Sequence, residues 1–170
     1  MKIKFYGTRG SVPTPDPDYS QFGGNTSCIQ ITFSSGRIAI LDAGTGIRNL
    51  WYDLIKHSHE QYDNINIILS HTHWDHIIGF PFFRPIYIPG TKLKVYGPIT
   101  FEDDSLEMIM GDLLRYRYFP VLHGELTANI EYLQLGECKM DLGDGIKLKT
   151  KYLNHPLLCL GFWFGFNCKF

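Results

Sequence analysis

The sequence has no excess of charge of one sign and no long apolar run. Its 16 basic and 17 acidic residues leave a formal net charge of -1. This balance gives no general electrostatic reason to expect a nucleic-acid-binding or membrane-surface protein, so any such partner has to be argued from a local site. No stretch of about 18 uncharged apolar residues predicts a membrane helix, and the first residues, MKIKFYGTRG, contain no signal-peptide core. We therefore expect a cytoplasmic protein without a membrane partner.

Cysteine is scarce and scattered. The four cysteines, at positions 28, 138, 159 and 168, form no CxxC pair. This spacing argues against a disulfide framework and against a cysteine zinc site, and it favours reduced, mostly buried thiols. With 170 residues, 44% of them hydrophobic, the chain is long enough to bury a core, and we expect a single domain over residues 1–170.

Strand and helix signals alternate along the first half, which predicts an α/β fold. Apolar periodicity predicts a helix from Gly46 to about His57. Thr100 and Asp103 resemble a capping box that opens a second helix through DSLEMIMGDLLRY. The strands are expected at 3–7, 26–33, 37–44, 64–70, 92–97, 128–136 and 145–153, with one more in the tail LLCLGFWFGFNCKF. The segment between the first two strands is rich in Gly and Pro, and a loop of this length is usually functional.

The stretch LSHTHWDHIIGFPFF, from Leu69 to Phe83, concentrates three histidines and an aspartate after a buried strand. His71 and His73 are two residues apart, so in an extended segment both imidazoles face the same side and can converge on one cation. Asp75 and His76 follow after the chain has begun to turn, which directs them to a neighbouring position. This spacing suits two adjacent metal ions better than one. The alternative is that these are surface-loop histidines that bind no metal ion.

The ligand type indicates the metal and its use. Imidazole and carboxylate groups suit Zn²⁺, with Mn²⁺ or Fe as alternatives, and the lack of nearby cysteine argues against a closed structural site. An open coordination position indicates catalysis, because a metal ion lowers the pKa of a bound water to roughly 7 and supports hydrolysis at neutral pH.

Two further residues have competing interpretations. Asp42 ends a strand before AGTG, where it either caps the following helix or orients a ligand histidine from the second shell. His155, before a proline, either terminates a strand or completes the set of His71 and His73 from a second strand end; we favour the ligand.

The long N-terminal loop and the segment after the histidine cluster also have two interpretations each. Arg9 and Asn25 either face a substrate anion or hold the long loop together. GFPFFRPIY is expected to be a core plug beneath the site rather than a base-stacking platform.

Several motifs, in order, resemble the metallo-β-lactamase superfamily: GTRGSVPTP, FGGNTSC, LDAGTGI, LSHTHWDHIIGFPFF and LNHP. The resemblance covers nearly the full chain and is strongest to the phosphodiesterase branch, near ribonuclease Z, the carbon–phosphorus lyase cyclic phosphodiesterase and the cyclic-nucleotide phosphodiesterases. It implies an αββα sandwich and hydrolysis of phosphodiesters by two zinc ions. By position, it implies that His71, His73 and His155 hold one ion and that Asp75 and His76 hold the other, with Asp75 as the catalytic base.

The sequence departs from this family at its C-terminal end. Relatives continue and supply an aspartate that bridges both metals and a final histidine, whereas here no Asp or Glu follows Asp144 and no His follows His155. The resemblance therefore implies a C-terminal half that lacks the usual final strands and helices, and a second metal that is weak or absent. An apolar sheet face and an unpaired edge would then favour a homodimer.

The sequence favours a metal-dependent phosphodiesterase acting on cyclic nucleotides or similar small phosphodiesters. The alternative from another class of function is a catalytically silent homologue that binds metal or a partner. A tRNA 3′-end endonuclease is a further alternative, although the sequence has no basic arm for tRNA phosphates, so a nucleic-acid partner is not favoured. A β-lactam or thioester hydrolase also remains open, since the motif alone does not select the electrophile. The residues that bind the substrate are not identified.

Overall fold

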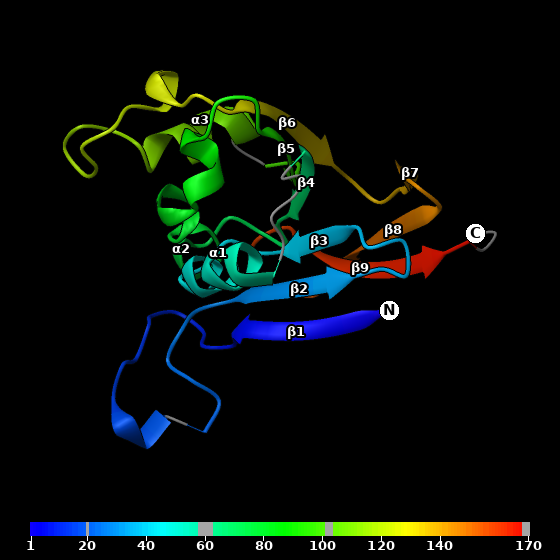
Figure 1. The fold of residues 1–170 in the computed structure, drawn as a ribbon, viewed down its shortest axis with the longest axis horizontal. Coiled ribbons are helices and arrows are strands. Elements are labelled where there is room, and N and C mark those ends of the chain that lie inside the picture. The colour runs from blue at the N-terminus through cyan, green and yellow to red at the C-terminus, as the bar shows by residue number, and fades with distance from the viewer. Residues whose placement is uncertain (20, 58–62, 101–103, 168–170) are drawn as a thin grey trace.

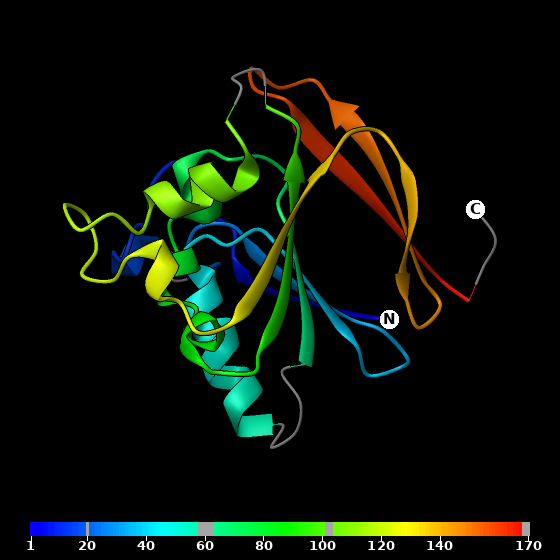
Figure 2. The same ribbon diagram turned by 90° about the horizontal axis from the view of Figure 1, so that it is seen from above.

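The structure is a computed structural model that describes residues 1–19, 21–57, 63–100 and 104–167. Two β-sheets lie face to face, and three α-helices cover the outer face of the larger sheet (Figure 1, Figure 2). The α/β sandwich expected from the sequence is confirmed, with mixed sheets and few helices. Within the described residues, no helix covers the outer face of the smaller sheet.

The larger sheet has six strands in the order β1-β2-β3-β4-β5-β6. The first three strands pair antiparallel, and β3 to β6 pair parallel. Parallel pairing places the carboxyl ends of β3 and β4 at one edge, where ligand sites commonly form. The strand bounds are β1 Lys2–Gly7, β2 Cys28–Thr32, β3 Ile38–Leu41, β4 Asp63–Ile68, β5 Lys92–Pro98 and β6 Asn129–Leu135.

The smaller sheet is antiparallel and has three strands, β7 Lys139–Gly143, β8 Ile146–Leu153 and β9 Cys159–Phe166. The strand β7 was not predicted from the sequence. Its burial alternates between exposed and half-buried residues, and its sequence KMDLG contains little of the β-branched and aromatic composition that marks a strand.

The three helices are α1 Gly46–His57, α2 Trp74–Ile77 and α3 Leu106–Asp112, and short 3₁₀ turns occur at 17–19, 80–82, 84–87 and 123–125. The helix expected near Thr100 begins later. Its N-cap is Ser105, whose side chain accepts a hydrogen bond from the Met108 N–H, so the prediction of a Thr100 cap is wrong. The hydroxyl of Thr100 instead donates to the carbonyl of Asp104, and Asp103 lies outside the described residues.

Two apolar clusters form the core. One lies between the larger sheet and the helices and includes Ile40, Leu50 and Phe80, whereas the other lies between the two sheets and includes Phe33, Leu148 and Leu160. Each side of the larger sheet is therefore buried, which explains the nearly continuous apolar runs of its parallel strands. Among the residues that the structure describes, no helix has the length and apolar character needed to cross a membrane.

Candidate metal centre

The histidine cluster lies where β4 of the larger sheet and β8 of the smaller sheet both end. Residues 69–76 follow β4, and His155 lies in the connection between β8 and β9. The N–H of Leu160, in β9, donates a 2.8 Å hydrogen bond to the carbonyl of Ser70. This bond fixes the two sheets against each other beside the cluster, so histidines that are 84 residues apart in the chain face one another.

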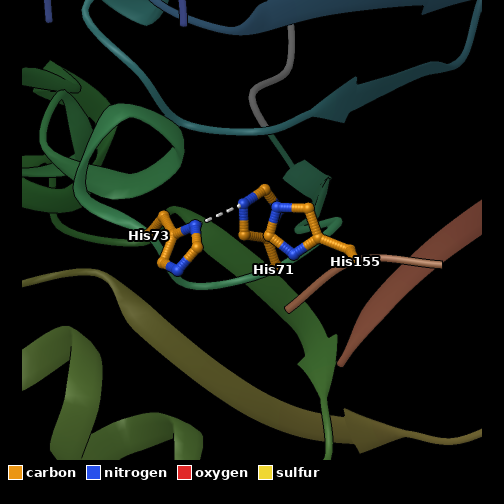
Figure 3. Close-up of side chains that lie close together, drawn as sticks. All are labelled: His71, His73 and His155. Atoms are coloured by element: carbon orange, nitrogen blue, oxygen red, sulfur yellow. Dashed lines mark hydrogen bonds between the residues drawn. The ribbon is translucent and has the colours of Figure 1, made fainter. Parts of the chain in front are cut away.

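His71, His73 and His155 each offer a ring nitrogen, and these three atoms all lie within 4.8 Å of one another (Figure 3). The Nε2 atom of His71 is 3.1 Å from the Nδ1 atom of His73. The ring of His155 lies 4.5 Å from the ring of His71 and 5.1 Å from that of His73. The i, i+2 spacing and the second strand end thus bring together the three residues that the sequence had assigned to one metal ion.

Asp75 and His76 form a second group beside the first. An oxygen of Asp75 lies 3.4 Å from Nε2 of His76, and the rings of His71 and His76 are 4.0 Å apart. The same oxygen of Asp75 accepts a 2.8 Å hydrogen bond from the N–H of Ser11. Ser11 has a φ of 66°, in the left-handed region that non-glycine residues rarely adopt. The long N-terminal loop therefore returns to the cluster and orients Asp75.

Asp42 lies beneath the cluster and does not cap the following helix. It accepts hydrogen bonds from the side chains of Ser27 and His76 and from both the N–H and the hydroxyl of Ser70. Its side chain is only 8% exposed, and its own φ is 59°. A buried carboxylate is stabilised when several donors satisfy it. The structure thus places Asp42 as the group that orients His76, the second of its two sequence-based interpretations.

The protein environment shifts the pKa values of His71 and His76 in opposite directions. Burial, followed by the charge of His76, lowers the pKa of His71 to about 4. Burial also favours a lower pKa for His76, but the hydrogen bond and charge of Asp42 and the charge of Asp75 outweigh it and raise the pKa of His76. His71 is therefore neutral near pH 7, the form in which imidazole binds a metal ion.

The short helix α2 is held against the loop after β3 by backbone contacts. The N–H of Ala43 donates to the carbonyl of His76, and the N–H of Gly79 donates to the carbonyl of Ala43. A Cβ atom at Gly79 would lie 2.0 Å from the carbonyl oxygen of Gly44, so this approach requires glycine. A four-residue helix does not form alone, and these contacts supply its stability.

Arg9 and Asn25, the remaining candidate residues, make contacts within the protein. Arg9 donates to the carbonyl of Gly23 and lies over the ring of Tyr19, and the side chain of Asn25 accepts from Thr45. These contacts hold the loop together, which was one of the two interpretations of Arg9 and Asn25.

The segment after α2 is mainly core, as expected. Phe80 and Phe83 are fully buried, whereas Phe82 is 56% exposed.

Neither Ser11 nor Ser70 was predicted from the sequence to contact the cluster. The position of Ser70 in the sequence indicated such a contact. Ser70 directly precedes His71 after β4, and β4 pairs in parallel with β3, the strand that precedes Asp42. The position of Ser11 gave no such indication, since its contact depends on the path of the loop.

The donor groups fit a divalent metal ion. The three histidines offer nitrogen ligands, and the adjacent pair adds one carboxylate and one imidazole. Nδ1 of His76 is occupied by Asp42, which leaves its Nε2 atom facing Asp75. This is the arrangement of metal-binding histidines, whose second ring nitrogen is held by a carboxylate or hydroxyl.

No family model matches the chain. Among the curated proteins, ribonuclease Z of Methanopyrus kandleri is 26% identical over 123 residues, which cover 69% of this chain and 39% of that protein. Ribonuclease Z of Staphylococcus aureus is 23% identical over 176 residues, which cover 95% of this chain and 48% of that protein. The chain thus spans about half, or less, of the length of these relatives.

Solved structures share the fold. The metallo-β-lactamase fold protein YhfI from Bacillus subtilis matches with a TM-score of 0.62 at 18% identity, over 96% of this chain and 56% of that one. Zn²⁺-bound PqqB from Methylobacterium extorquens matches with a TM-score of 0.62 at 12% identity, over 96% of this chain and 58% of that one. The resemblance inferred from the motifs is confirmed: the chain has the metallo-β-lactamase fold, and its sequence is similar to those of proteins named ribonuclease Z.

Proposed function

We propose that this protein is a metal-dependent hydrolase of phosphodiesters. The observation that supports it most is the convergence of His71, His73 and His155 from two strand ends, with Asp75 and His76 alongside. These residues are the proposed ligands, the first three for one ion and the last two for another. Zn²⁺ suits the nitrogen-rich set, with Mn²⁺ or Fe as alternatives. A divalent ion at such a site supplies Lewis acidity and lowers the pKa of a coordinated water.

The protein's own groups would orient the reactants. Asp75 is the proposed proton acceptor, and its contact with the Ser11 N–H holds one carboxylate oxygen in place while its side chain stays 12% exposed. His73 is exposed, so the cluster opens to solvent on that side and a substrate can reach it. Among the described residues, Asp75 and His76 are the two ligands proposed for the second ion, whereas three histidines are proposed for the first, so we expect the second ion to bind more weakly.

Small phosphodiesters, cyclic nucleotides among them, are the substrates that we favour. The near-neutral net charge of -1 gives no general attraction for a long polyanion. The similarity to proteins named ribonuclease Z favours a second candidate, cleavage of a phosphodiester in RNA such as the 3′ end of a tRNA precursor. Both candidates use the same metal centre and differ in the size of the substrate.

Hydrolysis assays separate these proposals. The protein would be loaded with Zn²⁺ or Mn²⁺ and assayed on bis(p-nitrophenyl) phosphate, on cyclic AMP and on a tRNA precursor. We expect turnover that falls on the order of 100-fold or more in His73→Ala and Asp75→Ala. His123→Ala is the matched control, because His123 contacts Tyr132 and none of the cluster histidines. Bound metal without turnover on any of the three substrates would overturn the hydrolase proposal and favour the catalytically silent alternative.

A further inference from the structure

Ser70 lies at the centre of the hydrogen bonds beneath the metal centre. Its hydroxyl oxygen is 2.9 Å and 3.1 Å from the two carboxylate oxygens of Asp42. The same atom is 3.0 Å from Nδ1 of His71 and 3.3 Å from Nδ1 of His76. One hydroxyl thus contacts the carboxylate and both histidines.

The chemistry of these groups assigns the hydrogens. An ionised carboxylate only accepts, so the hydroxyl hydrogen of Ser70 is donated to Asp42. The oxygen lone pairs of Ser70 then accept the Nδ1–H of His71. For His76, the Nδ1–H is donated to Asp42, which at 2.7 Å is closer than the Ser70 hydroxyl.

His71 then carries its hydrogen on Nδ1 and presents Nε2 without one. The position of this Nε2 atom agrees with the assignment. It is 3.1 Å from Nδ1 of His73, so it points into the proposed ligand cluster.

We propose that Ser70 is a positioning residue that connects Asp42 to His71 and fixes the tautomer and ring orientation of that histidine. Asp42 reaches His76 directly but reaches His71 through the Ser70 hydroxyl. Without this hydroxyl, the nearest remaining partner described for Nδ1 of His71 is the thiol of Cys159 at 3.8 Å, a weak hydrogen-bond group. The consequence for metal affinity rests on the proposed metal-binding function, whereas the tautomer does not.

The chain offers a matched control in Ser27. Its hydroxyl donates to the Oδ2 atom of Asp42 at 2.8 Å, and it contacts neither His71 nor His76. Ser70→Ala and Ser27→Ala therefore each remove one hydroxyl from Asp42, but only the first removes a partner of His71. Ser70→Thr keeps the hydroxyl and serves as the rescue variant.

Two measurements test the proposal. In the metal-free protein at pH about 8, long-range ¹H–¹⁵N NMR spectra should show His71 as the Nδ1–H tautomer in the wild type, in Ser27→Ala and in Ser70→Thr, and as a mixture in Ser70→Ala. Competition with a chelator should show about 10- to 100-fold weaker Zn²⁺ binding for Ser70→Ala and a change within about threefold for the other variants.

Two results would contradict the role proposed for Ser70. An unchanged tautomer in Ser70→Ala would overturn the proposal, and so would an equal loss of Zn²⁺ affinity in Ser27→Ala. Thermal unfolding of each variant checks that it is folded. If the wild type binds no Zn²⁺, the proposed function fails, while the tautomer measurement still decides the role of Ser70.

Discussion

Asp42 accepts a 2.7 Å hydrogen bond from Nδ1 of His76, and this contact joins the end of β3 to the segment that follows β4. The same carboxylate also satisfies Ser27 and Ser70. A single buried group thus holds the loops of two parallel strands in register beneath the histidine cluster.

Replacing the Asp42 carboxylate by an amide should destabilise the protein. Asp42→Asn keeps the size of the side chain and tolerates the φ of 59°, but it places an NH₂ group or a weaker acceptor among four donors. We expect the free energy of unfolding to fall by about 1–3 kcal/mol, as measured by urea denaturation. Asp112→Ala, which removes an exposed ion pair with Arg115, should change it by about 0.5 kcal/mol or less. Equal effects of the two substitutions would contradict the buried role of Asp42.

The close approach at Gly79 should not tolerate a methyl group. Gly79→Ala would place Cβ 2.0 Å from a backbone oxygen, so α2 has to move away from residues 43 and 44. We expect a loss of about 1–3 kcal/mol in the free energy of unfolding and weaker metal binding. Gly124→Ala is the control, since a Cβ there meets nothing within 4 Å. A Gly79→Ala variant with unchanged stability would show that α2 is not fixed by this contact.

The two aromatic residues of the 3₁₀ turn Phe80–Phe82 should differ in their contribution to stability. Phe80 is fully buried in the core, whereas Phe82 is 56% exposed and contacts Phe119 edge to face. Phe80→Ala should lower the free energy of unfolding by about 3–5 kcal/mol. Phe82→Ala should lower it by about 1 kcal/mol or less. A larger effect at Phe82 than at Phe80 would contradict the core arrangement.

The burial of His71 should make the metal-free protein sensitive to acid. In the unfolded chain this histidine binds a proton near pH 6.5, but in the folded protein its pKa is lowered to about 4. The unfolded state therefore binds more protons between these values, and stability falls as the pH falls through this window, with no contribution above it. The raised pKa of His76 acts in the opposite direction.

Comparison with His71→Gln isolates the effect of His71. Urea denaturation at pH about 7 and about 5, in the presence of a chelator, should show a smaller loss of stability on acidification in the variant than in the wild type. The same loss in both proteins would show that His71 protonates equally in the folded and unfolded states.

The sequence was informative where local chemistry decides the structure. The i, i+2 spacing of His71 and His73 after a buried strand determines that both rings face the same side, and this required no knowledge of the rest of the fold. The apolar period of residues 46–57 predicted α1 for the same reason.

Other features depend on contacts between distant segments. The approach of Ser11 to Asp75 depends on the path of a long loop, and the role of Asp42 depends on the pairing of β3 with β4. The cap of α3 was assigned to Thr100 because the capping pattern also occurs there, while the competing Ser105 satisfies the helix N–H. The strand β7 owes its conformation to pairing with β8 rather than to its own residues.

In the proposed metal centre, imidazoles from the ends of β4 and β8 bind one divalent ion together. The most direct measurement is the zinc content after equilibrium dialysis of the wild type, His155→Ala and the control His123→Ala. We predict about one tightly bound ion per chain in the wild type and in the control, and a loss of that ion in His155→Ala. A wild type that binds no zinc, or a His155→Ala variant that retains it at unchanged affinity, would contradict the account.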